Sequence, residues 1–274
     1  MLTRRRTSMW DARNARRAVL FGLLCALGCG GPKPPEIPPP GPPLRVGVSS
    51  VDSAPIVLRQ DGQLTGIEID FAKQLAPFLN REPVIVPLAR EDLMSALVEG
   101  RIDVIMSGII IPRTPQYRVT FSHPYLYTGL ATLVRKDDVG LYGSPASILN
   151  STKPVGVAAG SEATRIRLST PHVTQYPDLA GAVQALRRGQ VDLVIDEAHL
   201  LGWYARQDPS LAGVWMLLKY NQLGWVFRSE DSAAIAQTNA TLEWWRQDGT
   251  LNRTLRKWLP YWPGLDFTGK SQSQ

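Results

Sequence analysis

The sequence predicts an α/β fold of two lobes with a similar plan, and three observations indicate it. First, residues 44–108 alternate short β-branched runs with segments of helical periodicity, an order typical of parallel sheets covered by helices. Second, the plan recurs after Arg135, where DLAGAVQALRRGQVDLVIDE matches the earlier EDLMSALVEGRIDVIMSG in type. Third, the later run LKYNQLGWVFR would return the chain to the first lobe.

Each element of the first half has a local signal. Apolar runs rich in valine and isoleucine indicate strands, apolar residues at helical spacing indicate helices, and Gly or Asp-Gly marks the breaks. In chain order we expect a strand at Leu44–Ser49, a hairpin turning at Asp61-Gly62, a helix at Asp70–Leu79, the strand EPVIVPL, a helix at Asp92–Glu99 and the strand IDVIMSG, ended by Ser107-Gly108.

The second half follows the same logic. The expected elements are the turn FSHPY, the strand YTGLATLVRK, the strand KPVGVAAGS, the helix of DLAGAVQALRR, the strand VDLVI, the helix AHLLGWYARQ, the return strand LKYNQLGWVFR, and helices at Asp231–Asp248 and Thr250–Leu259 separated by Gly249. Strands followed by helices in both halves predict two α/β lobes.

The net charge of +6 is concentrated at the N-terminus. Residues 1–17 hold six arginines and one aspartate, so the rest of the chain is close to neutral and indicates no nucleic-acid partner. The apolar segment 18–28 that follows is short for a membrane span, so residues 1–28 are expected to be a secretion signal. An uncleaved anchor or a twin-arginine signal are the alternatives.

Cys29 lies at the end of this segment in ALGC, which resembles a bacterial lipobox with Ala26 at the usual leucine position. We expect Cys29 to carry a lipid, the alternative being that Cys25 and Cys29 are only apolar residues of the signal. Residues 29–43 are rich in proline and would form an extended tether for a lipid-anchored domain. With two cysteines there, no disulfide is expected in the folded part.

The order VD-x-x-I…SGI…FS-x-PY, ending in DGTL…KW, resembles the extracytoplasmic solute-binding proteins of family 3. These are the polar amino-acid-binding group of the two-lobed periplasmic binding proteins, and the resemblance spans Leu44 to Trp262. It implies a type II periplasmic-binding-protein fold in which each lobe is a mixed sheet flanked by helices and two hinge crossings join the lobes. The implied divisions are lobe 1 at 44–134, lobe 2 at 135–218, completion of lobe 1 at 219–262 and a tail at 263–274.

The resemblance also implies a ligand site between the lobes. Carried over position by position, the ligand-binding residues are expected to be Ser49, Asp52, Ser53, Arg90, Ser107, Gly108, Ile110, Arg113, Ser161, Glu162, Asp196 and Glu197. No catalytic residue, cofactor or metal is expected, because no Cys or His stands at metal-ligand spacing. The implied partners are a small polar solute and an ATP-driven importer or membrane sensor, with the chain a monomer on the periplasmic side of the envelope, in the outer membrane if there is one.

Three of these positions depart from the family pattern. Ile110 stands where amino-acid binders have Thr, and Pro115 stands where they have the Arg that clamps the ligand carboxylate. A proline cannot replace that bidentate donor, so Arg113 or Arg118 would have to reach inward, unless both are ordinary exposed arginines. Arg90 stands at the position of the aromatic lid.

Asp196 and Glu197 keep the family's acid, which accepts the ligand's ammonium group. Their alternative role is to cap the helix AHLLGWYARQ, because carboxylates favour helix N-termini. An acid without the Arg clamp would suit a cationic ligand with no free carboxylate.

Two rival functions remain open from the sequence. The family resemblance includes a periplasmic dehydratase of cyclohexadienyl acids, for which Glu197 or Glu162 would be the acid. Loss of the Arg and Thr also allows an interaction or sensor module that takes no ligand, since an unclamped pocket loses its main polar recognition.

Overall fold

The computed structural model describes residues 41–51 and 53–261 of the 274-residue chain. The predicted signal 1–28, Cys29, Asp52, most of the tether and the predicted tail 263–274 lie outside the described residues. In the part of the chain that is described, none of the helices has the length and apolar character needed to span a bilayer.

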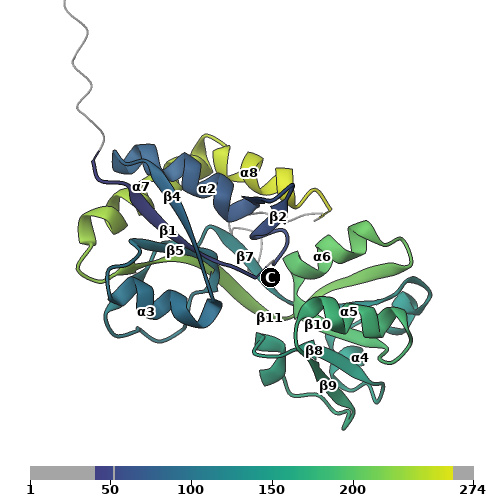
Figure 1. Cartoon of the computed structure of the whole chain (residues 1–274). Helices are drawn as coiled ribbons and strands as arrows, with labels where there is room; N and C mark the ends of the chain where they lie inside the picture. The colour runs from purple at the N-terminus through teal and green to yellow at the C-terminus, as the bar shows by residue number, and fades with distance from the viewer. Residues whose placement is uncertain (1–40, 52, 262–274) are drawn as a thin grey trace, which may run out of the picture. The chain divides into compact units, whose positions relative to one another are not determined.

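Three parallel strands are the centre of the first lobe (Figure 1). β1 (Leu44–Ser49) pairs with β4 (Pro83–Leu88) on one side and with β5 (Val104–Ile110) on the other. This confirms the predicted parallel arrangement. It also turns the carboxyl ends of the strands, where ligands bind in open α/β sheets, toward one edge.

Helices cover both faces of this sheet. α2 (Ile67–Leu75), α7 (Ser232–Gln247) and α8 (Thr250–Trp258) contribute to one core with β1 and β5, and α3 (Leu93–Val98) packs in a second core on the opposite side. Residues 104 and 106 belong to the first core and 105 to the second, as the two-residue period of a strand requires.

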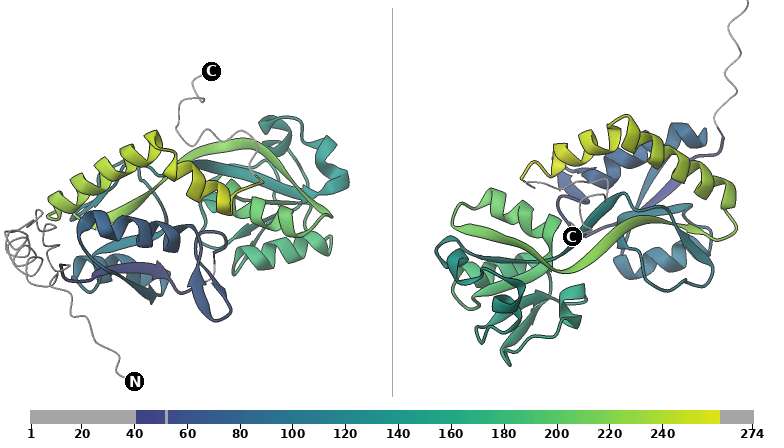
Figure 2. Two further views of the ribbon diagram at one scale, coloured as in Figure 1. Left: turned by 90° about the horizontal axis from the view of Figure 1, so that it is seen from above. Right: turned by 180° about the vertical axis from the view of Figure 1, so that it is seen from behind.

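Two long antiparallel strands connect the lobes, β7 (Leu126–Arg135) and β11 (Leu211–Arg228), and β11 is the long curved ribbon in the right-hand view of Figure 2. They are the two expected crossings. Their pairing slips between Val214 and Lys219, and at Gly129 a Cβ atom would lie 2.0 Å from the Lys219 carbonyl oxygen. Only glycine allows this close backbone approach.

The second lobe extends the same sheet through β10 (Leu193–Glu197), β8 (Val155–Ala158) and β9 (Val173–Tyr176). α5 (Leu179–Arg187) and α6 (Ala198–Gln207) contribute to one core there, and α4 (Pro145–Leu149) to another. The lobes therefore share one nine-stranded sheet through β7 and β11. Residues 131 and 133 of β7 already pack in the second lobe, so we place the crossing near residue 129, ahead of the boundary expected after Val134.

Three predicted elements have clearly different bounds. The return strand expected to start at Leu218 begins at Leu211. The helix expected at Asp70–Leu79 begins at Ile67 and becomes a 3₁₀-helix at Ala76–Leu79, because Pro77 cannot donate a helical hydrogen bond. Ser107-Gly108 does not end its strand. Although Gly108 adopts a φ of 63°, the strand runs on to Ile110. The remaining elements are β2 (Leu58–Gln60), β3 (Gln63–Thr65), β6 (Val119–Phe121) and 3₁₀-helices at Arg90–Asp92, Lys136–Leu141 and Glu162–Arg165.

Candidate ligand-binding site

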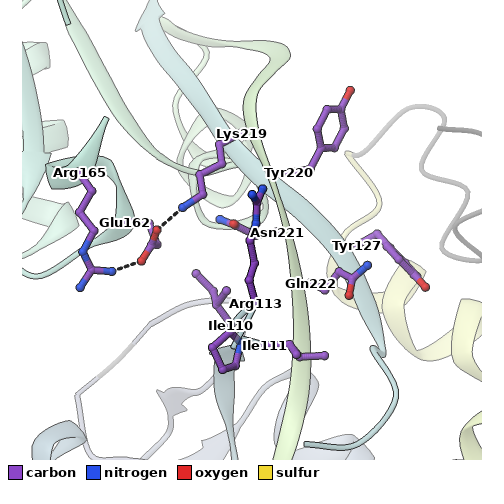
Figure 3. Close-up of a pocket in the computed structure, with 11 residues that line it drawn as sticks. Ile110, Ile111, Arg113, Tyr127, Glu162, Arg165, Lys219, Tyr220, Asn221 and Gln222 are labelled. Carbon is purple, nitrogen blue, oxygen red and sulfur yellow. Dashed lines mark hydrogen bonds and ion pairs between the residues drawn. The ribbon is translucent and has the colours of Figure 1, made fainter. Parts of the chain in front are cut away.

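A cavity of about 720 Å³ lies where the end of β5, the 3₁₀-helix Glu162–Arg165 and the crossing strands meet (Figure 3). Its walls therefore come from both lobes and from the strands that join them. The lining residues are Ile110, Ile111, Pro112, Arg113, Tyr127, Glu162, Arg165, Lys219, Tyr220, Asn221 and Gln222.

Three of the predicted site residues line this cavity, Ile110, Arg113 and Glu162. Arg113 is exposed, and among the described residues no hydrogen bond or ion pair holds its guanidinium. Arg118 does not line the cavity; it has a φ of 66°, and its carbonyl accepts a hydrogen bond from the Ser229 amide. Of the two arginines proposed from sequence, Arg113 is therefore the one placed to meet a ligand.

The predicted residues Ser49, Ser107 and Gly108 lie on the neighbouring strands β1 and β5, and we call the Ser107-Gly108 segment the predicted ligand turn. The Ser49 amide donates to Ser107 Oγ at 2.9 Å, and both residues are buried. The Gly108 amide donates to Glu68 Oε1 at 2.7 Å. This hydrogen bond holds the backbone of Gly108 in place. Its acceptor, Glu68, was not among the residues predicted from the sequence.

Glu68 is fully buried at the start of α2 and accepts two more hydrogen bonds, from Tyr125 Oη at 2.7 Å and Trp225 Nε1 at 2.8 Å. Burial raises the pKa of Glu68 to about 7, although the bonds from Gly108, Tyr125 and Trp225 lower it. This carboxylate joins the predicted ligand turn to the aromatic core. The signal in the sequence was an acid inside the otherwise apolar start of a helix, GIEID.

Asp196 and Glu197 end β10 and are both buried. Asp196 Oδ1 accepts a hydrogen bond from the Glu197 amide at 2.7 Å, and Glu197 Oε1 accepts one from Asn221 Nδ2. Although Glu197 is at the N-cap position of α6, its side chain makes no capping hydrogen bond. The Glu197 carboxylate is therefore turned toward the crossing strand β11, and helix capping does not account for it.

Burial is the main cause of the raised pKa values of Asp196 and Glu197. It raises the pKa of Asp196 to about 6, against the hydrogen bond from the Glu197 amide and the charge of Arg90. It also raises the pKa of Glu197 to about 7, against side-chain hydrogen bonding by Asn221 and Thr128 and with help from the charges of Asp196 and Glu162. A buried carboxylate of this kind gains stability when a cation binds to it.

Arg90 connects the two lobes electrostatically. Its Nη1 donates to the Ser107 carbonyl at 3.3 Å in the first lobe, and its charge stabilises ionised Asp196 in the second. Desolvation lowers the pKa of Arg90, and Asp196 opposes this effect. The cation predicted at the lid position therefore acts on Asp196 through its charge, with no ion pair between the two among the described residues.

Unpartnered polar atoms distinguish three of the predicted residues. Among the described residues, Ser53 Oγ, Ser161 Oγ and Glu197 Oε2 are buried side-chain oxygens without a hydrogen-bond partner, as are the hydroxyls of Thr132 and Thr238, which were not predicted. Leaving a buried polar group unpaired costs about 1–3 kcal/mol. Ser53 and Ser161 come after the carboxyl ends of β1 and β8, and Glu197 is the last residue of β10, so all three lie at strand ends of the kind where ligands bind in open α/β sheets.

The crossing strands supply site residues that the sequence reasoning did not select. Lys219, Asn221 and Gln222 of β11 line the cavity, and so does Tyr127 of β7. A signal for them was present, because LKYNQLG places three polar side chains in a run that otherwise returns to the core. Glu162, which was predicted, bonds to Lys219 at 2.5 Å and also pairs with Arg165.

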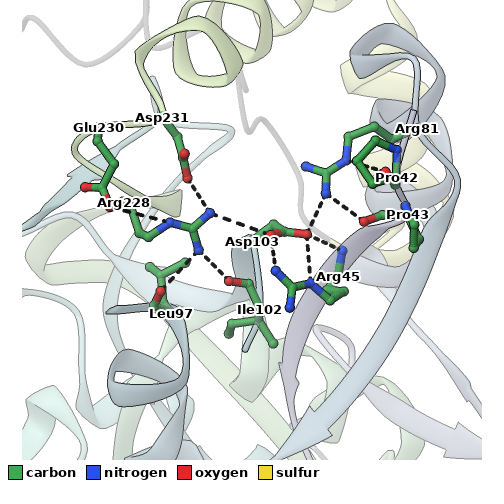
Figure 4. Close-up of polar contacts among 10 residues, drawn as sticks. All are labelled: Pro42, Pro43, Arg45, Arg81, Leu97, Ile102, Asp103, Arg228, Glu230 and Asp231. Carbon is green, nitrogen blue, oxygen red and sulfur yellow. Dashed lines mark hydrogen bonds and ion pairs between the residues drawn. The ribbon is translucent and has the colours of Figure 1, made fainter. Parts of the chain in front are cut away.

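A second charged cluster lies away from this site, at the amino ends of β1 and β5 (Figure 4). Asp103 accepts hydrogen bonds from Arg45 Nη2 at 2.6 Å and Arg81 Nη2 at 2.7 Å, and Arg228 lies 3.6 Å away. Arg81 also donates to the carbonyls of Pro42 and Pro43. The cluster therefore anchors the point where the described chain begins, at the end of β1 opposite the cavity.

Replacing Asp103 with Asn is expected to destabilise the protein by about 2 kcal/mol at pH 7. Burial alone would raise the pKa of Asp103, but the hydrogen bonds from Arg45 and the charges of Arg81 and Arg45 lower it to about 2. Its contribution is therefore present above the unfolded pKa near 4 and is lost as the pH falls toward 2. Urea denaturation at pH 7 and pH 3 measures both effects. Glu99→Gln, which breaks an exposed pair with Arg101, is the control and should change stability by less than about 0.5 kcal/mol.

The fold and the cleft define the class of protein: a two-lobed binding protein of the periplasmic type. The sequence model of the bacterial extracellular solute-binding proteins, family 3, matches residues 44–261, and the chain belongs to that family. This confirms the resemblance seen in the sequence.

Individual relatives agree with this assignment. The chain is 28% identical to an L-cystine-binding protein of Escherichia coli over 76% of this chain and 77% of that protein. It is 26% identical to a cyclohexadienyl dehydratase of Pseudomonas aeruginosa over 80% and 84%. Among solved structures, it resembles an ancestral cationic amino acid solute-binding protein with a TM-score of 0.71 and 28% identity, covering 78% of this chain and 94% of the other.

Proposed function

We propose that this chain is an extracytoplasmic solute-binding protein that captures a small amino-acid-like ligand between its lobes and presents it to a membrane transporter. The observation that carries the proposal is Glu197, a buried carboxylate with one unpartnered oxygen, bonded to the cavity-lining Asn221. A ligand ammonium or guanidinium group supplies the charge that this acid lacks. The names of the relatives, which include cystine and cationic amino acid binders, support the same ligand class.

Arg113 is proposed as the partner of the ligand's acid group. It lines the cavity on the side of the first lobe, and among the described residues nothing else engages its guanidinium. A guanidinium on the loop after β5 can form a bidentate pair with a carboxylate, which Pro115 at the usual position cannot. Recognition thus requires two opposite charges on one ligand, and closure of the lobes brings their partners together.

Replacing Arg113 with Ala is expected to weaken binding of amino acids at least tenfold, because it removes the carboxylate partner. The measurement is a thermal-denaturation screen with the common amino acids, guanidino compounds, polyamines and small peptides, in which a ligand of the folded state raises the midpoint. Arg118→Ala is the matched control from the same loop and should leave every shift unchanged. Equal shifts in both variants contradict the role given to Arg113.

Envelope location and lipid anchoring complete the proposal. The apolar segment before Cys29 and the proline-rich residues after it are what a lipid-anchored binding domain needs to stand clear of a membrane. Gly30 after the cysteine is not an acidic residue, which favours the outer membrane. Mass spectrometry of the protein expressed in a bacterial host, with Cys29→Ser beside it, tests the lipid directly.

Two rival functions have their own tests. The relative named as a cyclohexadienyl dehydratase, and the raised pKa of Glu197 to about 7, keep an enzyme in view, because such a group can donate a proton at neutral pH. Turnover of a cyclohexadienyl acid that disappears in Glu197→Gln would favour it. A protein that no solute stabilises would favour the sensor or interaction module.

A further inference from the structure

The cavity contains more positive than negative side chains. Arg113, Arg165 and Lys219 line it as cations, and Glu162 is the only acid among its lining residues (Figure 3). Glu162 is shared: its Oε2 lies 2.5 Å from Lys219 Nζ, and its Oε1 pairs with Arg165. The cavity therefore holds an excess of positive charge even with Glu162 ionised, which suits a ligand with an acid group.

Both oxygens of Glu162 are already occupied by cations. Its side chain is 17% exposed, and the hydrogen bond from Lys219 is the main reason that the pKa of Glu162 is lowered. A further cation from a ligand would gain little there, because no oxygen is free to receive it. Glu197 offers the opposite situation, with a buried oxygen that has no partner among the described residues. The two acids of the site therefore have different roles.

The position of Lys219 gives it access to a ligand. It lies on β11 where the register with β7 shifts, opposite Leu130, and its side chain is 40% exposed within the cavity lining. Arg165, at 74% exposed, can follow Glu162 if that side chain turns outward. Lys219 can thus exchange the carboxylate of Glu162 for one from a ligand without losing its charge partner.

We propose that Lys219 forms a carboxylate subsite in which Glu162 is the resident competitor, and that Arg165 stays paired with Glu162 when a ligand displaces it. An acid group of the ligand replaces Glu162 at Lys219, so Lys219 determines the preference for ligands with a carboxylate and Glu162 limits their affinity. This rests on the proposed function, since it describes the same cavity. It adds a second anion position to the one assigned to Arg113, and favours amino acids with an additional acid group or an elongated body.

The test compares ligands that differ only by their carboxylates. Calorimetric titrations of the full chain use L-cystine, whose two carboxylates supply one partner each for Arg113 and Lys219, against cystamine, the same diamine without its carboxylates. In Glu162→Gln, the preference for the amino acid over its amine is expected to rise about tenfold, because the competitor loses its charge. In Lys219→Met the preference is expected to fall about tenfold. Glu99→Gln, which removes an acid from an exposed ion pair outside the cavity, should change neither.

The outcomes separate this inference from the proposed function. If the natural chain binds an amino acid but Glu162→Gln leaves the preference unchanged or lowers it, the subsite is wrong and the solute-binding role stands. If only Glu162→Gln binds the amino acids, the subsite is supported and the natural chain is not a receptor for them. Absence of binding in both proteins overturns the inference, since removal of the competitor must reveal carboxylate binding.

Discussion

Replacing Glu68 with Leu is expected to destabilise the protein by about 4 kcal/mol. The change removes the carboxylate that accepts hydrogen bonds from the Gly108 amide, the Tyr125 hydroxyl and the Trp225 indole. These three donors then have no acceptor. Each unpaired buried group costs about 1–3 kcal/mol, and leucine's added apolar contact offsets part of the sum. Denaturation in urea measures the loss of stability.

Tyr125→Phe is the matched control for this change. It removes one of the three donors and keeps the ring against Phe71 and Trp225, whose centroids lie 5.5 and 5.4 Å from that of Tyr125. The expected cost is about 1 kcal/mol, because Glu68 retains two hydrogen bonds. A Glu68→Leu protein as stable as Tyr125→Phe would show that the carboxylate is not the link between the ligand turn and the core.

Replacing Glu197 with Gln is expected to stabilise the free protein by about 2–3 kcal/mol at pH 8 while removing ligand binding. The pKa of Glu197 is raised to about 7 by burial, so the folded state favours the protonated acid. The protonated Glu197 side chain contributes its full stability to the folded state below the unfolded pKa near 4.5. This contribution is lost as the pH rises through 7. A rise of the pKa of Glu197 from about 4.5 to about 7 corresponds to about 3 kcal/mol of stability lost when the carboxyl ionises.

The pH dependence makes this prediction specific. At pH 4 the natural protein and Glu197→Gln should be about equally stable, because both carry a neutral side chain there. The gap should open between pH 4.5 and 7 and then stay constant. Binding sites for charged ligands often lower the stability of the free protein in this way, because a buried charge has no partner until the ligand binds. A variant less stable than the natural protein at pH 8 would mean that Glu197 has an internal cation partner.

The fold could be predicted from sequence because its signals are local and repeated. Short apolar runs rich in β-branched residues marked β1, β5 and β10, and the return strand was recognised as the second crossing. The bounds of α2 were missed because Pro77 is compatible with a 3₁₀ turn as well as with a helix end. That β7 and β11 join both lobes into one sheet depends on pairing between distant segments, which local patterns do not contain.

The site was predictable only where a strand end dictates it. Ser107, Asp196 and Glu197 follow from the topology, since ligands meet the carboxyl ends of strands. Lys219 and Asn221 come from the middle of a crossing strand, and only the strand register shows which of its side chains face the cavity. The expectation of a cation without a carboxylate assumed that Pro115 left nothing in place of the clamp. The positions of Arg113 and Lys219 in the cavity lining are the reason that we propose a ligand with a carboxylate.

The most direct test of ligand capture by the cleft is calorimetric titration of the natural protein and Glu197→Gln with the amino acid that gives the largest rise in melting midpoint. The account predicts one binding site per chain in the natural protein and a loss of affinity of at least 100-fold in the variant, because the ligand's cation then meets a neutral amide. Equal affinities in the two proteins would contradict the central role of Glu197.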